Sequence, residues 1–130
     1  MFKINQETKQ INITYGDYAV MDVSTINEDD GTDYVFKVGD VVRFKVYEKN
    51  GCNNVVLQKD VEVKEENTVV SIELQGEDTS IGDIISNKID YWYELILNPK
   101  TRPQTIVGYD ENKAKIFRLY PKGADLNDID

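Results

Sequence analysis

The sequence contains no histidine and a single cysteine, Cys52. Without an imidazole, the Ser-His-Asp and Cys-His pairs of hydrolases cannot form, because no other unperturbed side chain titrates near neutral pH to take the proton. One thiol cannot close an intrachain disulfide, and structural zinc requires several cysteine or histidine ligands. These absences exclude the commonest nucleophilic mechanisms and structural zinc, so we expect no enzymatic activity, no cofactor and no metal.

Positive charge and long apolar runs are scarce as well. Among 130 residues, 15 lysines and arginines face 24 aspartates and glutamates, which gives a net charge of −9. Proteins that bind nucleic acid or anionic lipid draw most of their affinity from basic side chains, so we expect neither nucleic acid nor a membrane as partner. The first residues lack the apolar core of a signal peptide, and no later stretch approaches the length of a membrane span. The sequence therefore predicts synthesis in the cytoplasm without a signal peptide.

Alternation of apolar and polar residues with a period of two dominates the chain. Turn residues interrupt it about every eight to twelve positions, as in sandwiches or barrels of short antiparallel strands. The strongest segment is 89–97, one face of which carries Tyr91, Tyr93, Leu95 and Leu97. We predict an all-β fold, an antiparallel β-sandwich of about seven or eight short strands in one domain, 1–121, followed by an acidic tail, 122–130. A small barrel alternates in the same way and is the second candidate.

Turn signals indicate how the strands connect. Asn50-Gly51 supplies the positive-φ conformations of a tight hairpin, which predicts that 55–63 returns beside 42–46. Further hairpins are predicted between 11–14 and 19–23, and between 105–109 and 115–120. The pairs Gly16-Asp17 and Gly39-Asp40 predict turns rather than a phosphate-binding loop, because no helix and lysine follow them.

Helix signals are confined to one place. At most one short helical turn is expected near residues 78–85, capped by Asp78 or Thr79. Three isoleucines at helical spacing would form its apolar side, Ile81, Ile84 and Ile85.

The aromatic trio at 91–93 is the main candidate binding feature. Trp92 must face opposite to Tyr91 and Tyr93 in a strand, so the three rings cannot form one platform. Tyr91 and Tyr93 are either core residues, part of a protein interface, or a sugar-stacking surface. We take them as the candidate interface residues.

Acidic residues suggest two further sites, neither of them specific. The loop 27–33 could bind calcium through Asp29, Asp30 and Asp33, but its spacing fails the EF-hand pattern, and a solvated hairpin loop is the simpler interpretation. Carboxylate-pair catalysis, as in glycosidases, would require two acids about 5–9.5 Å apart in a cleft, and no pair stands out in the sequence.

The order of motifs resembles a known family. The succession runs through INITYGDYA at 11–19, YVFKVGDVVRF at 34–44, EDT at 77–79, YWYELIL at 91–97, QTIVG at 104–108 and KIFRL at 115–119. It resembles the N-terminal immunoglobulin-like domain of the baseplate upper proteins of tailed phages that infect Gram-positive bacteria, and small proteins encoded near their tail genes. The resemblance covers roughly residues 9–120.

This resemblance implies an immunoglobulin-like sandwich that acts as a structural module of the virion, in the tail or baseplate. Its partners would be other tail or baseplate proteins, for example those that carry host attachment, and homo-oligomers stay open. No functional residue carries over, because the matched motifs are turns and core strands. The alternative is a carbohydrate-binding module that recognises host-surface polysaccharide through exposed tyrosines.

Overall fold

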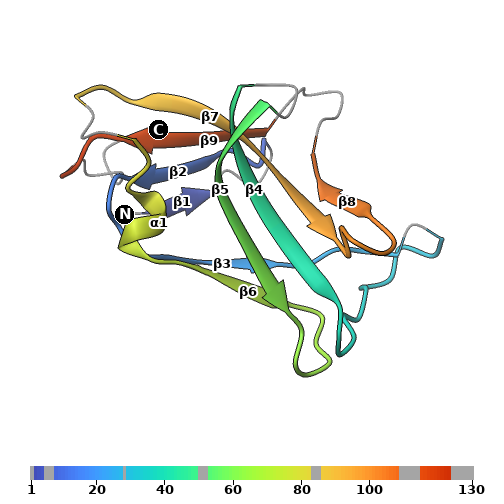
Figure 1. The fold of residues 1–130 in the computed structure, drawn as a ribbon. Coiled ribbons are helices and arrows are strands. Elements are labelled where there is room, and N and C mark those ends of the chain that lie inside the picture. Colours follow the sequence, from blue (N-terminus) through green and yellow to red (C-terminus); the bar gives the residue numbers. More distant parts are fainter. Residues whose placement is uncertain are drawn as a thin grey trace.

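The computed structural model describes residues 2–4, 8–27, 29–49, 53–82, 86–108 and 115–123. Within these residues the chain forms a seven-stranded sheet and a two-stranded sheet (Figure 1). The large sheet runs in the order β1 (Phe2–Ile4), β2 (Ile11–Thr14), β9 (Lys115–Tyr120), β7 (Ile89–Leu97), β4 (Val41–Lys49) and β5 (Asn53–Glu62), with β8 (Gln104–Val107) also paired to β7. The small sheet pairs β3 (Ala19–Val23) with β6 (Val70–Leu74). The all-β prediction is confirmed.

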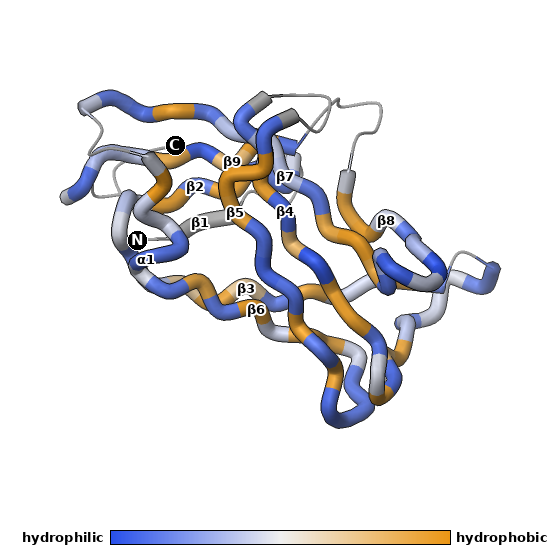
Figure 2. The backbone as a smooth tube through the Cα atoms, in the orientation of Figure 1, coloured by the Kyte–Doolittle hydropathy of each residue, from blue (hydrophilic) through white to orange (hydrophobic). Residues whose placement is uncertain are grey.

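The core lies between the two sheets, because alternation directs the apolar side chains of each sheet toward the other. Figure 2 shows this alternation of apolar and polar residues along β4 and β5. Phe44 of β4 is fully buried at the centre, and its ring lies 5.6 Å from that of Tyr93 and 6.1 Å from that of Phe117. From the small sheet, the same core receives Ala19, Met21, Val23, Val70, Ile72 and Leu74.

The predicted hairpin between 11–14 and 19–23 is wrong. β2 pairs with β1 and, in parallel, with β9, whereas β3 pairs with β6 in the other sheet. Both strands send apolar side chains into the same core from opposite sides, which two neighbours in one flat hairpin cannot do. Gly16, with φ +82°, bends the chain from one layer to the other.

The predicted hairpin between 105–109 and 115–120 is also wrong. β8 pairs with the second half of β7, at residues 95–97, and β9 pairs with its first half, at residues 89–93. The two strands therefore follow one another along the same edge of β7, and neither lies beside the other. The hairpin of β4 with β5 is confirmed, although Asn50, Gly51 and Cys52 lie outside the described residues.

The helical turn is present but begins earlier than predicted. α1 spans Gly76–Thr79, and its N-cap is Gln75 instead of Asp78 or Thr79. Asp78 stabilises the start of the helical turn in another way. Its carboxylate accepts a hydrogen bond from the backbone N–H of Gln75 at 2.8 Å. Ile81 follows the turn and is buried, while Ile84, Ile85 and most of the predicted acidic tail lie outside the described residues. No helix in the described part of the chain is long and apolar enough to span a membrane.

Candidate functional site

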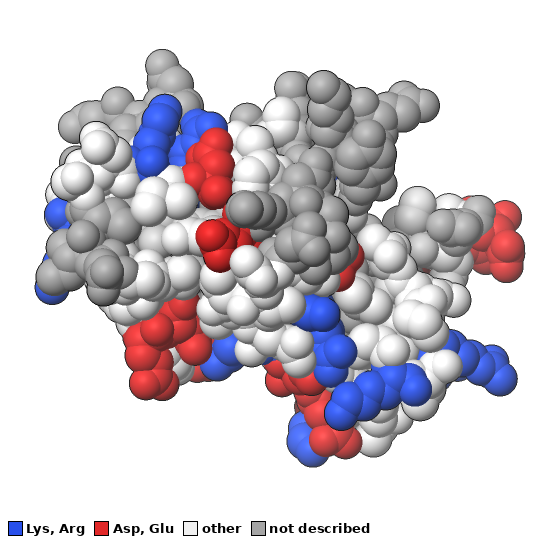
Figure 3. Space-filling view, turned by 45° about the horizontal axis from the view of Figure 1, so that its top comes forward, with Lys and Arg blue, Asp and Glu red and all other residues white. Residues whose placement is uncertain are grey.

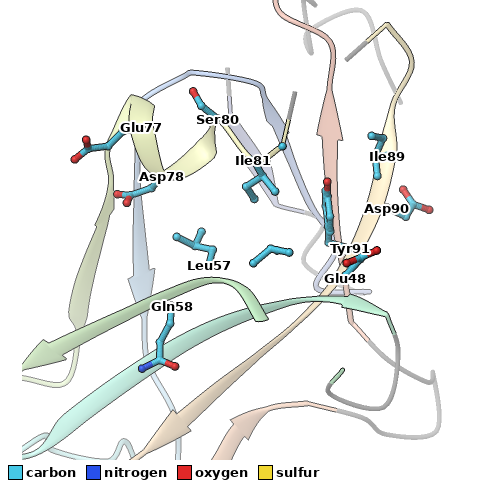
Figure 4. A pocket seen from close by; sticks show the side chains of 12 residues that line it. Glu48, Leu57, Gln58, Glu77, Asp78, Ser80, Ile81, Ile89, Asp90 and Tyr91 are labelled. Atoms are coloured by element: carbon cyan, nitrogen blue, oxygen red, sulfur yellow. The ribbon is translucent and has the colours of Figure 1, made fainter. Parts of the chain in front are cut away.

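A groove with a volume of about 920 Å³ opens at the end of the molecule where β5 and β7 begin (Figure 4). Its apolar part includes Leu57 from β5, Ile81 from the segment after α1, and Tyr91 from β7. In the register, Leu57 pairs with the core residue Val46 and therefore faces inward. Among the described strands, however, β6 pairs only with β3, so no third strand of the small sheet covers the inner face of β5. The segment from α1 to Gly82 forms the facing wall of the groove.

Carboxylates surround the groove, and among the described residues no lysine or arginine lines it. The acidic residues along it are Glu48, Glu77, Asp78 and Asp90. Lys59, beside the groove, neutralises Asp78 at 3.0 Å. It points inward on β5 because its register partner is the core residue Phe44. The rim keeps an excess of negative charge.

Arg118 of β9 neutralises a second rim residue. Its guanidinium donates two hydrogen bonds to the carboxylate of Asp90, at 2.6 and 3.0 Å. These bonds, against a smaller effect of partial burial, hold the pKa of Asp90 below its usual value. Glu48 and Glu77, by contrast, form no ion pair with any described residue. They are the rim charges that a cationic ligand would meet.

The two tyrosines predicted as interface residues are buried in the core, with exposures of 7% for Tyr91 and 6% for Tyr93. Of the three interpretations, core packing is the one that the structure confirms, because both rings share the inward face of β7 with Leu95 and Leu97. Burial, and for Tyr91 also the nearby charge of Glu48, raises the pKa of each phenol.

The two rings also end at different places. Tyr91 reaches the groove, whereas Tyr93 donates its hydroxyl hydrogen to the carbonyl of Lys9 and lines a separate cavity of about 270 Å³ beside β3 and β8. The structure therefore does not bring Tyr91 and Tyr93 together as one binding surface.

The described residues of the acidic loop, Asn27 and 29–33, are organised as a hairpin loop. Asp30 accepts hydrogen bonds from the backbone N–H and the hydroxyl of Thr32, at 3.0 and 2.7 Å, which lowers the pKa of Asp30. Ile26 and Asp33 pair across the base of the loop, and Gly31 takes φ +73° at its end. No three histidine, cysteine or acidic side chains in the described part of the chain come together as a metal site. The geometry supports the solvated-loop interpretation.

The shifted carboxyl groups among the described residues do not include the raised one that carboxylate catalysis would need. A glycosidase needs one carboxylic acid with a raised pKa, so that it stays protonated at working pH. Every described carboxyl group with a shifted pKa, namely Asp30, Asp40, Asp60 and Asp90, is shifted downward by hydrogen bonds to its ionised form.

Several groove residues had no signal in the sequence. Glu48, Leu57 and Asp90 come from three different strands, and each alone is typical of an ordinary strand residue. Only the packing of the two sheets places them around one space. No family model, curated protein or solved structure matches the chain, so the functional conclusions rest on the residues and their geometry.

Proposed function

We propose that this chain is a non-enzymatic structural component of a bacteriophage tail or baseplate, an immunoglobulin-like module that acts through protein-protein assembly in the virion. The observation that carries the proposal is an all-β module with an apolar groove whose described rim is acidic. Contiguous apolar surface rimmed by polar groups is typical of binding sites.

The strand order supports an immunoglobulin-like fold. The strand order β9-β7-β4-β5 in one sheet, with β3-β6 in the other, resembles strands G, F, C and C′ opposite B and E of a variable-type domain. Antibody domains place a buried tryptophan on strand C against a disulfide. In this chain the equivalent strand carries the buried Phe44, packed on Tyr93 and Phe117, which agrees with the presence of a single cysteine.

Purified particles of the phage that encodes the chain provide the test. We expect mass spectrometry of gradient-purified virions to detect the chain in a constant ratio to other tail proteins, and immunogold labelling to place it on the tail. A phage protein that stays in the host cytoplasm serves as the control for contamination. Absence of the chain from particles at the level of that control would refute the proposal.

A carbohydrate-binding module is the second candidate, favoured only by Tyr91, whose ring lines the groove beside the carboxylate of Glu48. Aromatic faces combined with a few polar groups are common in small-molecule sites. Glycan-array binding that is lost in Tyr91→Ala and kept in Ile89→Ala, with both variants folded, would favour this candidate. We expect no glycan binding by the unmodified chain.

A further inference from the structure

We propose that the groove binds an extended, basic segment of a partner protein, whose lysine or arginine side chains lie on the apolar floor and reach the acidic rim. The floor includes Leu57, Ile81 and Tyr91, and the rim includes two carboxylates without an ion pair, Glu48 and Glu77. The inference deepens the proposed function by naming the chemistry of the partner. Its role in a tail rests on that function, whereas the binding itself does not.

The groove has an apolar middle with carboxylates on both sides. Figure 4 shows Glu77 and Asp78 on one side and Glu48 and Asp90 on the other, with Leu57 between them. A basic side chain fits such a site, because its aliphatic stem packs on apolar surface while its charged head stays at the polar border. In an extended segment, alternate side chains point to the same face, so basic residues on either side of an apolar one can reach both sides of the groove.

Tyr91 supplies a second, independent sign of a ligand. Its side chain is buried, with 7% exposure, and its hydroxyl forms no hydrogen bond with any described residue. Every fully buried polar side-chain atom in the described part of the chain has a hydrogen-bond partner, so this hydroxyl must open into the groove that the ring lines. A phenol donates one hydrogen bond, and a main-chain carbonyl of an extended segment is a suitable acceptor.

Glu48 links this hydroxyl to the rim. Burial, and to a smaller extent the charge of Glu48, raises the pKa of Tyr91, so the phenol keeps its proton at neutral pH and remains a donor. From the described residues, the carboxylate of Glu48 accepts one long hydrogen bond, at 3.4 Å, from the side-chain amide of Asn54. Glu48 therefore keeps most of its capacity to accept hydrogen bonds from an ammonium or guanidinium group.

The cations near the groove do not reverse its charge. Lys59 pairs with Asp78, and Arg118 pairs with Asp90, which Lys88 also approaches. On the face that Figure 3 presents, basic side chains lie among acidic ones, so charge alone does not single out a site. The groove differs by combining two carboxylates outside any described ion pair with an apolar floor and a hydroxyl donor. The net charge of −9 also attracts a basic partner from a distance.

A synthetic peptide tests the proposal, acetyl-Ser-Arg-Ser-Leu-Ser-Arg-Ser-amide with a fluorescent label. Its alternation places both arginines and the leucine on one face of an extended chain. One control peptide replaces both arginines by glutamate, and another replaces leucine by serine. In fluorescence anisotropy at low ionic strength, we expect the arginine peptide to bind at least about tenfold more tightly than the glutamate peptide. Loss of the leucine should weaken binding by about threefold or more.

Variants of the chain locate the binding. Glu48→Gln combined with Glu77→Gln removes both charges at constant shape and should weaken binding of the arginine peptide by about tenfold. Tyr91→Phe keeps the ring and removes the hydroxyl, which should weaken binding by about threefold and leave stability unchanged, because the hydroxyl has no partner among the described residues. The matched control is Glu65→Gln combined with Glu66→Gln, which removes the same charge from the exposed connection between β5 and β6 and should change binding by less than about twofold.

Three results would overturn the proposal. They are no saturable binding of the arginine peptide at millimolar concentration, equal binding of the glutamate peptide, and an equal loss in the control variant. Circular dichroism checks that every variant is folded. Peptide binding by a chain that is absent from virions would refute the tail proposal alone, and a virion protein that fails to bind the peptide would refute this inference alone.

Discussion

The carboxylate of Asp40 gives a sharp prediction about stability. Its Oδ2 accepts bonds from Lys37 and Tyr34, and its Oδ1 accepts the amide of Asn98. Asp40→Asn keeps the shape of the side chain and turns one of these oxygens into an NH₂ group. If the NH₂ group faces Asn98, two donors oppose each other, and if it faces Lys37 and Tyr34, two bonds are lost.

The expected cost follows from these contacts. A hydrogen bond to a charged group contributes about 1.5–3 kcal/mol, and the half-exposed position of Asp40 places the loss toward the lower end. We therefore expect Asp40→Asn to lower the free energy of unfolding by about 1–2 kcal/mol at pH 7.

The contacts of Asp40 also determine how its contribution to stability changes with pH. Partial burial raises the pKa of Asp40, but the bonds from Lys37, Asn98 and Tyr34 outweigh it, so the folded pKa lies below the unfolded value. The charged carboxylate thus stabilises the fold above the unfolded pKa of ~3.9, and this contribution disappears as pH falls through the lower folded value. The difference between the unmodified chain and Asp40→Asn must therefore shrink below about pH 4.

Urea unfolding followed by the fluorescence of Trp92, the single tryptophan, measures this difference at pH 7 and at several acidic pH values. The slope of the free energy with urea is expected to stay the same, because the variant exposes no additional surface on unfolding. Equal midpoints at pH 7, or a difference that persists unchanged at pH 3, would refute the assigned role of the carboxylate.

Three further predictions concern the core, the rim and the inter-sheet turn. Phe44→Ala should lower the free energy of unfolding by about 3–5 kcal/mol, because it empties the fully buried centre of the core. Urea unfolding measures this loss, and the exposed control Val20→Ala should lose at most about 0.5 kcal/mol. Arg118→Met should raise the pKa of Asp90, because the two hydrogen bonds that favour its ionised form are lost, and carboxyl-resolved NMR titration would contradict this if the pKa stayed unchanged. Gly16→Ala should lower the free energy of unfolding by about 1–2 kcal/mol, because φ at this position is +82°. The added Cβ meets no atom closer than 3.7 Å, so backbone strain alone would cause the loss. An unaltered midpoint of thermal unfolding would contradict this.

Local patterns predicted the strands well. The segment 89–97 is β7 with the bounds and the buried face expected from its alternation, and 19–23 is β3 with the same agreement. Alternation is a property of neighbouring residues, and a strand with one buried face must have it wherever it lies in the fold. The turns at Gly16 and Gly39 were predictable for a similar reason, since positive φ favours glycine whatever surrounds it.

Strand partners and the groove depended on distant contacts. The pattern of 11–14 is compatible with a hairpin to β3, yet those residues pair with β9, more than a hundred positions away in the chain. Alternation states which face of a strand is buried and contains no information about which strand covers that face.

The sequence by itself determined the strands, the tight turns, the excess of negative charge and the absence of histidine chemistry. Tertiary structure decided which strands pair and which side chains meet around the groove, because the groove residues belong to different strands and to the segment after β6. It buries Tyr91 and Tyr93 on the inward face of β7 and makes Tyr91 one wall of the groove.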